Sequence, residues 1–216
     1  MGNLWKGFKE HRTFRFTSLL VILLIALVVL APVIAPYNPL EAVMKDANQA
    51  PSMAHLFGTD KLGRDVLSRI LYGGAYSLSS VLALVVIIFC VGTFLGLVAG
   101  YFGGLIDTVI MRIADMMISF PGVILAIAIA GIMGGSLVNA MIALTAVTWT
   151  KYARLSRSMV LKIRKRDFVD AAIVSGGTSS HILWTHIMPN VVPILVITAV
   201  SDIGAMMMEL AGLSFL

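Results

Sequence analysis

Acidic side chains inside an apolar run are the first residues of this chain that could take part in chemistry. Asp202 and Glu209 stand seven positions apart near the C-terminus, so a helix would place them on one face, with Met206 between them. Acids within a membrane segment usually face a bundle interior or a water-filled path. Carboxylates and thioethers can briefly hold a soft or borderline divalent cation. We interpret these three residues as candidates for lining a path for a charged solute, although methionines in apolar helices mostly serve packing.

A polar segment between two apolar ones is the second candidate, and its chemistry would be the docking of a partner. Residues 168–174 favour a short helix whose small alanines can lie deep in a groove of another protein. We expect Gly176 to end that helix with a positive φ, and Pro189 to begin the next span, where its missing N–H costs nothing. The alternative is an amphipathic helix on the surface of a basic loop. The candidate docking residues are Asp170, Ala171, Ala172, Gly176, His186 and Pro189.

Patterns for catalysis and cofactor binding are missing from the sequence. It contains neither the Gly-x-x-x-x-Gly-Lys-Ser/Thr pattern of nucleotide-binding loops nor the His-Glu-x-x-His pattern of zinc proteases. The sequence also lacks a nucleophile–base pair, which an intramembrane protease would need. His181 and His186 lie in the polar segment, where we expect a structural role for both. We therefore expect no catalytic residue, no metal site and no cofactor, which argues against an enzyme.

The composition is that of a membrane protein. Of the 216 residues, 59% are hydrophobic and 12% are charged, about half the charged fraction of a typical soluble domain. Cys90 is the only cysteine, so a disulfide framework is excluded, and we expect its side chain to be a small buried apolar group. The net charge of +5 comes from basic clusters beside apolar runs. Such clusters report orientation in a membrane, and they do not call for a nucleic-acid partner.

Five apolar stretches are expected to cross a bilayer core of about 30 Å. The third should be kinked at Pro121, and glycines 131, 134 and 135 with Ser136 should separate the third from the fourth. Small residues at 92, 96 and 100 follow the spacing that lets helices pack closely in lipid. Arg112 and Asp115, three residues apart on a helix, can neutralise each other. The five stretches lie at about 17–36, 77–101, 107–132, 137–153 and 191 to the end.

The charge distribution predicts a cytoplasmic N-terminus. This orientation puts both basic clusters inside, in residues 1–16 and in the loop 154–190, and leaves the neutral loop near 133–136 outside. The predicted organisation is a cytoplasmic segment, a first transmembrane helix, an extracytoplasmic loop and a core domain that contains the loop 154–190. Their bounds are 1–16, 17–36, 37–76 and 77–216.

The polar segment resembles the Glu-Ala-Ala loop by which permease subunits of bacterial ABC importers dock onto their ATPases. Asp170-Ala171-Ala172, Gly176 and Pro189 follow the spacing of that loop, with Asp170 in place of its Glu. His186 fills the usual hydrophobic position, and Met188 replaces the usual Leu. The run from His186 to Asn190 is similar to the variant of the loop in peptide and nickel importers.

Two further stretches resemble C-type subunits of the same class. Residues 57–69 look like the stretch before the core domain, with turns expected at Gly58 and Gly63 and local pairing expected among Asp60, Arg64 and Asp65. Residues 96–121 are similar to the second and third spans of the family. Around 111–117 and 201–209 the sequence looks more like nickel permeases than dipeptide permeases.

The resemblance implies an all-α polytopic bundle that forms half of a path for nickel or a nickel chelate, with a dipeptide or oligopeptide as the alternative solute. It implies four kinds of partner in a bacterial inner membrane: a second homologous permease, two ATP-binding subunits, an extracytoplasmic solute-binding protein and membrane lipid. Family members usually have six spans, so we expect this sequence to be truncated after its fifth. A stand-alone secondary transporter or a membrane enzyme is the remaining alternative, but the sequence shows no internal repeat of the kind that secondary transporters contain.

Overall fold

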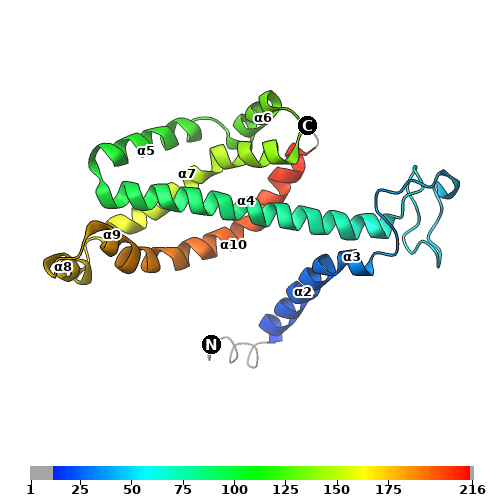
Figure 1. Cartoon of the computed structure of the whole chain (residues 1–216), viewed down its shortest axis with the longest axis horizontal. Coiled ribbons are helices and arrows are strands. Elements are labelled where there is room, and N and C mark those ends of the chain that lie inside the picture. Colours follow the sequence, from blue (N-terminus) through cyan, green and yellow to red (C-terminus); the bar gives the residue numbers. More distant parts are fainter. Residues whose placement is uncertain (1–11, 215–216) are drawn as a thin grey trace. The chain divides into compact units, whose positions relative to one another are not determined.

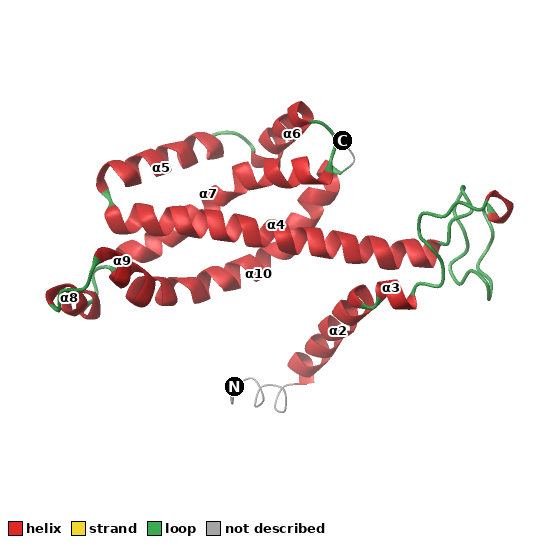
Figure 2. Cartoon of the chain, in the orientation of Figure 1, coloured by secondary structure: helices red, strands yellow, loops and turns green. Residues whose placement is uncertain are grey.

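The computed structural model describes residues 12–214, which are built from helices and loops (Figure 2). Within that range there is no strand, only one isolated bridge between Thr59 and Asp65. The all-α fold class is therefore confirmed. The chain divides into two compact units, one ending at Ser79 and the other beginning at Ser80.

The helices are labelled as in Figure 1. The first unit contains α2 (Arg12–Val29), α3 (Ala31–Ile34), the 3₁₀ turn η1 (Met44–Asp46) and the start of α4 (Val66–Phe102). The second contains the rest of α4, then α5 (Gly104–Ile118), α6 (Gly122–Met133), α7 (Leu137–Ile163), α8 (Asp167–Val174), α9 (Ser179–His181), the π-helical segment η2 (Ile182–Ile187) and α10 (Met188–Leu213).

The first apolar stretch forms two helices in place of one. The chain turns at Leu30, and Pro32 stands in the first turn of α3. Because proline has no N–H and its ring collides with the preceding turn, a straight helix through this point is disfavoured. The helical part ends at Ile34, two residues before Pro36.

The helix α4 starts earlier than the hydrophobic pattern predicts. It runs unbroken for 37 residues from Val66, which is about 55 Å at 1.5 Å per residue. A bilayer core of about 30 Å covers little more than half of that length. The predicted span at 77–101 is thus the apolar part of a longer helix, whose first turns contain the polar residues Ser68 and Arg69.

The third apolar stretch is broken where a kink was predicted. The helices α5 and α6 meet at 91° across residues 119–121 (Figure 1). Pro121 occupies the cap position before α6 with an extended ψ of 118°, and its carbonyl accepts from the Leu125 N–H at 3.1 Å. Both helices pack along α7. The location of the bend was predictable from Pro121, whereas its size was not.

The separation of α6 from α7 follows the predicted signals. Gly134 has a φ of +90° at the end of α6, a conformation that only glycine adopts without strain. Ser136 then caps α7 by accepting the Asn139 N–H at 3.1 Å. The Asn139 side-chain amide donates to the carbonyls of Met133 and Gly134, which closes the connection.

Close packing of α4 on α7 confirms the prediction for the small residues. A Cβ on Gly92 would stand 2.5 Å from the Trp149 carbonyl oxygen, and one on Gly96 would stand 2.3 Å from that of Ala153. A Cβ on Gly100 would meet the Val160 side chain at 2.8 Å. A real Cβ atom does not approach another heavy atom so closely. The two backbones can therefore meet only because these positions lack side chains.

Two large apolar clusters and a smaller one around Trp149 form the interior of the second unit. One gathers side chains of α4, α6, α7 and the C-terminal half of α10, among them Leu84, Leu144 and Leu210. The other joins the cytoplasmic ends predicted for α4 and α7 to α8, η2 and the start of α10. The second cluster ties the polar segment to the bundle. Cys90, which was predicted to be buried, is exposed, because its position on α4 points away from both clusters.

Within residues 12–214, two helices are long and apolar enough to cross a membrane, α4 and the continuous helix Ser179–Leu213. The broken pair α5–α6 raises the number to three. The apolar part of the first helix, Arg15–Val29, is shorter, and α7 contains Lys151, Arg154 and Arg157 in its second half. The count of five spans, like the domain bounds, stays a prediction.

Candidate coupling segment and polar cavity

The helix α8 is fixed to the bundle by one side only. Val169 is completely buried and packs in the second apolar cluster with Ile182, Leu183 and Ile187, and Ala172 packs against the same cluster. At 100° per residue, Asp170, Ala171 and Val174 lie on the opposite side of the helix, and all three are exposed. We call these three residues the outer face of α8. Of the two predicted docking alanines, Ala171 therefore points outward and Ala172 toward the chain's own core.

The end of α8 has the predicted geometry. Gly176 has a φ of +84°, which confirms the expected left-handed conformation. Its N–H donates to the Ile173 carbonyl and that of Gly177 donates to the Ala172 carbonyl, both at 3.0 Å. Gly177 thus helps to end α8 together with Gly176. A Cβ there would stand 2.8 Å from the Ala172 carbonyl oxygen, so this turn needs a glycine at 177 for space and one at 176 for conformation.

The next helix begins well before the predicted start near 191. Thr178 caps it by accepting the His181 N–H at 3.3 Å, and the helix continues through η2 into α10. Pro189 stands in the first turn of α10, directly after the π-helical segment. Pro189 has no N–H to donate to the Thr185 carbonyl, and its ring would collide with that carbonyl in a regular α-helix. The wider turns of η2 make room for the ring, so the helix continues.

The two histidines of this segment contact each other. The rings of His181 and His186 meet edge to face with centroids 5.7 Å apart, and Thr185 Oγ1 lies 3.4 Å from His181 Nδ1. The His186 carbonyl accepts from the Asn190 side-chain amide at 2.6 Å. These contacts stay within one stretch of helix, and the structural role of both residues stays a prediction.

Two ion pairs join α5 to α7, and one of them corrects a prediction. Asp115 was expected to pair with Arg112 one turn earlier, but its carboxylate accepts from Arg154 of α7. Asp107 pairs with Arg157 in the same way, through Arg157 Nε and Nη2. Arg154 and Arg157 lie one turn apart on the side of α7 that α5 covers, so the inter-helical pairs replace the local one.

Asp202 of α10 is hydrogen-bonded to two side chains of α7. Its carboxylate accepts from Lys151 Nζ at 2.7 and 2.8 Å and from the Tyr152 hydroxyl at 2.9 Å. The pairing brings a buried tyrosine and a cation against an acid from an apolar helix. It satisfies the charge that a carboxylate could not keep alone in such surroundings.

A cavity of about 460 Å³ lies where α5 and α6 break, and it contains charges of both signs. Lys151 lines it from α7 and Glu209 from α10. Of the three residues predicted for the path, only Glu209 lines the cavity. Asp202 lies outside the lining, paired with Lys151, and Met206 is 7% exposed and belongs to the first apolar cluster. The remaining lining residues are Met117, Ile118, Phe120, Pro121, Gly122, Val123, Leu144, Val147, Thr148 and Thr150.

Comparison with known proteins identifies the family. The model of binding-protein-dependent transport system inner membrane components matches residues 92–216, and that of the N-terminal TM domain of oligopeptide transport permease C matches residues 1–51. The first match covers more than half of the chain. The chain belongs to the binding-protein-dependent permease family.

Relatives of this permease transport several solutes. It is 36% identical to the dipeptide transport system permease protein DppC of Haemophilus influenzae, over 98% of this chain and 74% of that protein. It is 38% identical to the nickel transport system permease protein NikC of Escherichia coli, over 92% of this chain and 72% of that protein. It is 37% identical to the glutathione transport system permease protein GsiD of Pectobacterium atrosepticum, with coverages of 98% and 71%. These similarities confirm an inner-membrane permease subunit of the peptide/nickel class.

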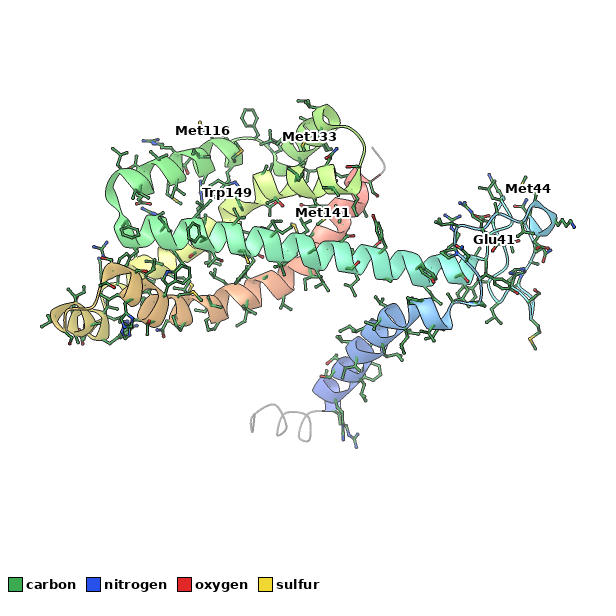
Figure 3. All side chains as sticks on the ribbon, viewed as in Figure 1. Glu41, Met44, Met116, Met133, Met141 and Trp149 are labelled. Carbon is green, nitrogen blue, oxygen red and sulfur yellow. The ribbon has the colours of Figure 1, made fainter. Side chains whose placement is uncertain are left out.

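The methionines of the permease do not converge on one point. On α10, Met206 is buried while Met208 is 79% exposed. On α5, Met111 packs toward Trp149 of α7, whereas Met116 points away from the bundle and is 58% exposed (Figure 3). Only Met117 among the methionines of α5 lines the cavity. These methionines of α5 and α10 therefore do not form one set of thioether ligands.

The segment before α4 is a compact turn structure. Gly58 and Gly63 have φ values of +72° and +71°, and Asp60 pairs with Arg64 at 2.8 Å, as predicted. Hydrogen bonds from the Arg64 side chain hold the pKa of Asp60 well below its usual range. Asp65 was expected to join that pair, but its carboxylate is turned toward His55 Nδ1 at 3.0 Å and the Ser68 N–H at 2.8 Å.

Proposed function

We propose that this permease forms half of an import path and receives the work of ATP hydrolysis through α8. The outer face of α8 supports the proposal, because it presents Ala171 and Val174 with the carboxylate of Asp170, and the exposed Asp167 lies one turn earlier on the same side. The other side of the helix is held by the apolar cluster around Val169. A short helix of this kind suits the groove of a partner. The partners we infer are two ATP-binding subunits, a second permease and an extracytoplasmic solute-binding protein.

The structure offers a direct route from α8 to the cavity. Val169 of α8 packs on Ile182 and Ile187. These two residues belong to the continuous helix Ser179–Leu213, which also contains Glu209. A displacement of α8 would therefore move α10, which also carries Asp202 against α7. Alternating access needs a movement of helices around a fixed site, and α10 is the element that joins the docking surface to the charged residues.

The proposed orientation places the N-terminus and residues 154–190 in the cytoplasm and residues 37–76 outside. The basic side chains of α7 and of the segment after it support this orientation. Cysteines introduced at Met53 and Lys165, both exposed, in a Cys90→Ala background, should react oppositely with a membrane-impermeant thiol reagent on intact cells. Labelling at 165 without labelling at 53 would overturn the orientation, and the coupling role with it.

For the solute, we propose a small molecule that carries both charges, with a dipeptide as the leading candidate. The mixed cavity favours this class because Glu209 can approach an ammonium group, and Lys151 has a third N–H for a carboxylate besides the two that it donates to Asp202. A free divalent cation would meet the Lys151 ammonium at the same wall. A nickel chelate is the second candidate. Asp202 and Glu209 lie two turns apart on one side of α10, and an organic chelator would carry carboxylates that Lys151 could approach.

Uptake by cells that carry the whole transport operon, with this permease as the only variant, tests the proposal. Glu209→Gln should lower dipeptide uptake about ten-fold, the effect of losing one charged contact of about 1.4 kcal/mol. Glu41→Gln, in the first unit, is the matched control and should keep wild-type uptake. If Glu209→Gln instead lost the uptake of radioactive nickel and kept normal dipeptide uptake, the order of the two candidates would be reversed. Asp170→Lys should lower ATPase copurification whichever solute is correct, because it reverses a charge at the docking contact.

A further inference from the structure

A second cavity of the permease lies beside α8. Its volume is about 600 Å³, and its walls come from the last turns of α7, the first residues of α8 and the start of α10. It shares no lining residue with the cavity that contains Lys151 and Glu209. None of its lining residues belongs to the outer face of α8.

The rim of this cavity is basic. Lys162 stands in the last turn of α7, and Arg166 is the residue that precedes α8. Both side chains are exposed, and neither forms an ion pair with any residue between 12 and 214. Asp167 also lines the cavity, so two positive charges and one negative charge leave a net charge of +1.

The walls below the rim are apolar. Met159 and Ile163 contribute from α7, Phe168 from α8 and Ile194 from α10. Phe168 and Ile194 are each almost half exposed, although both are large hydrophobic residues. A free phosphate would satisfy the two cations but would leave these walls in contact with water, whereas a molecule with an anionic head and a hydrocarbon chain would cover both.

We propose that this cavity binds the headgroup of an anionic phospholipid, with Lys162 and Arg166 on the phosphate and an acyl chain along Ile163 and Ile194. The proposal rests on the orientation given above, which puts this end of α7 at the cytoplasmic leaflet, where anionic lipids gather and basic pockets between helices bind their headgroups. The bound lipid would bridge α7, α8 and α10. It would therefore stabilise the position of the coupling helix.

Native mass spectrometry of the complete importer tests the site, with dioleoyl phosphatidylglycerol as the probe and dioleoyl phosphatidylcholine as the neutral comparison. The double variant Lys162→Gln and Arg166→Gln should hold phosphatidylglycerol about thirty-fold more weakly, the effect expected for two basic side chains near a lipid headgroup. Lys165→Gln is the matched control, because Lys165 is an exposed neighbour that does not line the cavity. It should bind like the wild type.

A second variant separates a lipid from a free anion. Ile194→Trp fills the apolar part of the cavity and leaves both cations, so it should reduce phosphatidylglycerol binding while the ATPase still copurifies. Displacement of the lipid by inorganic phosphate, equal retention of phosphatidylcholine, or unchanged binding by the double variant would each overturn the proposal. Copurification of the ATPase in the same sample keeps the outcome distinct from a failure of the coupling role.

Discussion

Residues 37–65, between α3 and α4, are held by hydrogen bonds and ion pairs, whereas residues 164–187, between α7 and α10, are held mainly by apolar side chains. In the first segment, Asp60 and Asp65 each accept from several donors, and the Thr59 hydroxyl links the Gln49 N–H to the Asp46 carbonyl. In the second, Val169, Ile182 and Ile187 are fully or almost fully buried. The polar groups at its outer face have no comparable network.

The difference indicates which segment is complete by itself. The first satisfies many of its polar groups with its own residues and with Ser68 and Arg69 in the first turn of α4, as a segment exposed to water can do at little cost. The second buries one side of α8 and leaves Val174 88% exposed on the other. A short helix that is anchored on one side by buried side chains and open on the other is suited to the groove of a partner.

The largest expected effect comes from a charge at the outer face. Val174→Lys should reduce ATP-driven uptake and ATPase copurification about ten-fold or more, since losing a central interface contact costs about 1–2 kcal/mol. A lysine near the C-terminus of α8 is favourable for the helix itself, so fraying cannot explain a loss. Uptake and copurification are measured on the same membranes.

Met53→Lys is the control from the first segment. Met53 is 97% exposed in residues 37–65, so the same substitution is made at an equally open apolar position, and transport should not change. Equal losses from both variants would contradict the comparison between the two segments. An unchanged Val174→Lys would remove the main support for docking through α8.

The second effect concerns the turn after α8. Gly176→Val forces a β-branched residue into a φ of +84°, which costs about 1–2 kcal/mol and redirects the helix. We expect uptake to fall several-fold with unchanged abundance in the membrane. Gly176→Asn should largely restore uptake, because asparagine tolerates the left-handed region. Equal activity of the valine and asparagine variants would show that this conformation has no role in coupling.

The sequence predicts what is decided by neighbours along the chain. The short helix at 167–174, the positive φ of Gly176 and the break before Ser136 follow from capping and turn chemistry. Glycines 92, 96 and 100 were also predictable, because their i, i+4 spacing has few other uses in an apolar helix.

Contacts between distant residues were not predictable from local pattern. Asp115 pairs with an arginine 39 positions away and Asp202 with a lysine 51 positions away, and a single sequence contains no signal for either pair. The 91° bend at Pro121 depends on how α5 and α6 pack on α7, and the exposure of Cys90 depends on which face of α4 the other helices cover. The coupling role proposed for α8 came from the resemblance of residues 170–189 to the docking loop of the family, because a single chain contains no contact with the partner.

A smaller effect is expected in the first segment. Asp65→Asn removes a buried carboxylate that accepts from the Ser68 N–H, the Ser68 hydroxyl and His55. Replacing a charged hydrogen-bond acceptor of this kind should destabilise the segment locally by about 2 kcal/mol. Hydrogen exchange of residues 46–66 should accelerate, while ATPase copurification stays normal. A loss of copurification would mean that the two segments are not independent.

The smallest effect is a dependence of that segment on acid. Burial acts to raise the pKa of Asp65, but hydrogen bonds from Ser68 and His55 outweigh it and hold the pKa below its usual value. A carboxylate with a lowered pKa stabilises the fold above its unfolded pKa of about 3.9, and this contribution is lost as the pH falls from there through the folded pKa. Exchange of residues 46–66, corrected for the intrinsic effect of pH, should therefore accelerate below about pH 4. The exchange of residues 164–187 should change less, because Val169, Ile182 and Ile187 do not titrate. Asp65→Asn should weaken the acid response of the first segment, and an unaltered response in that variant would assign it to other carboxylates.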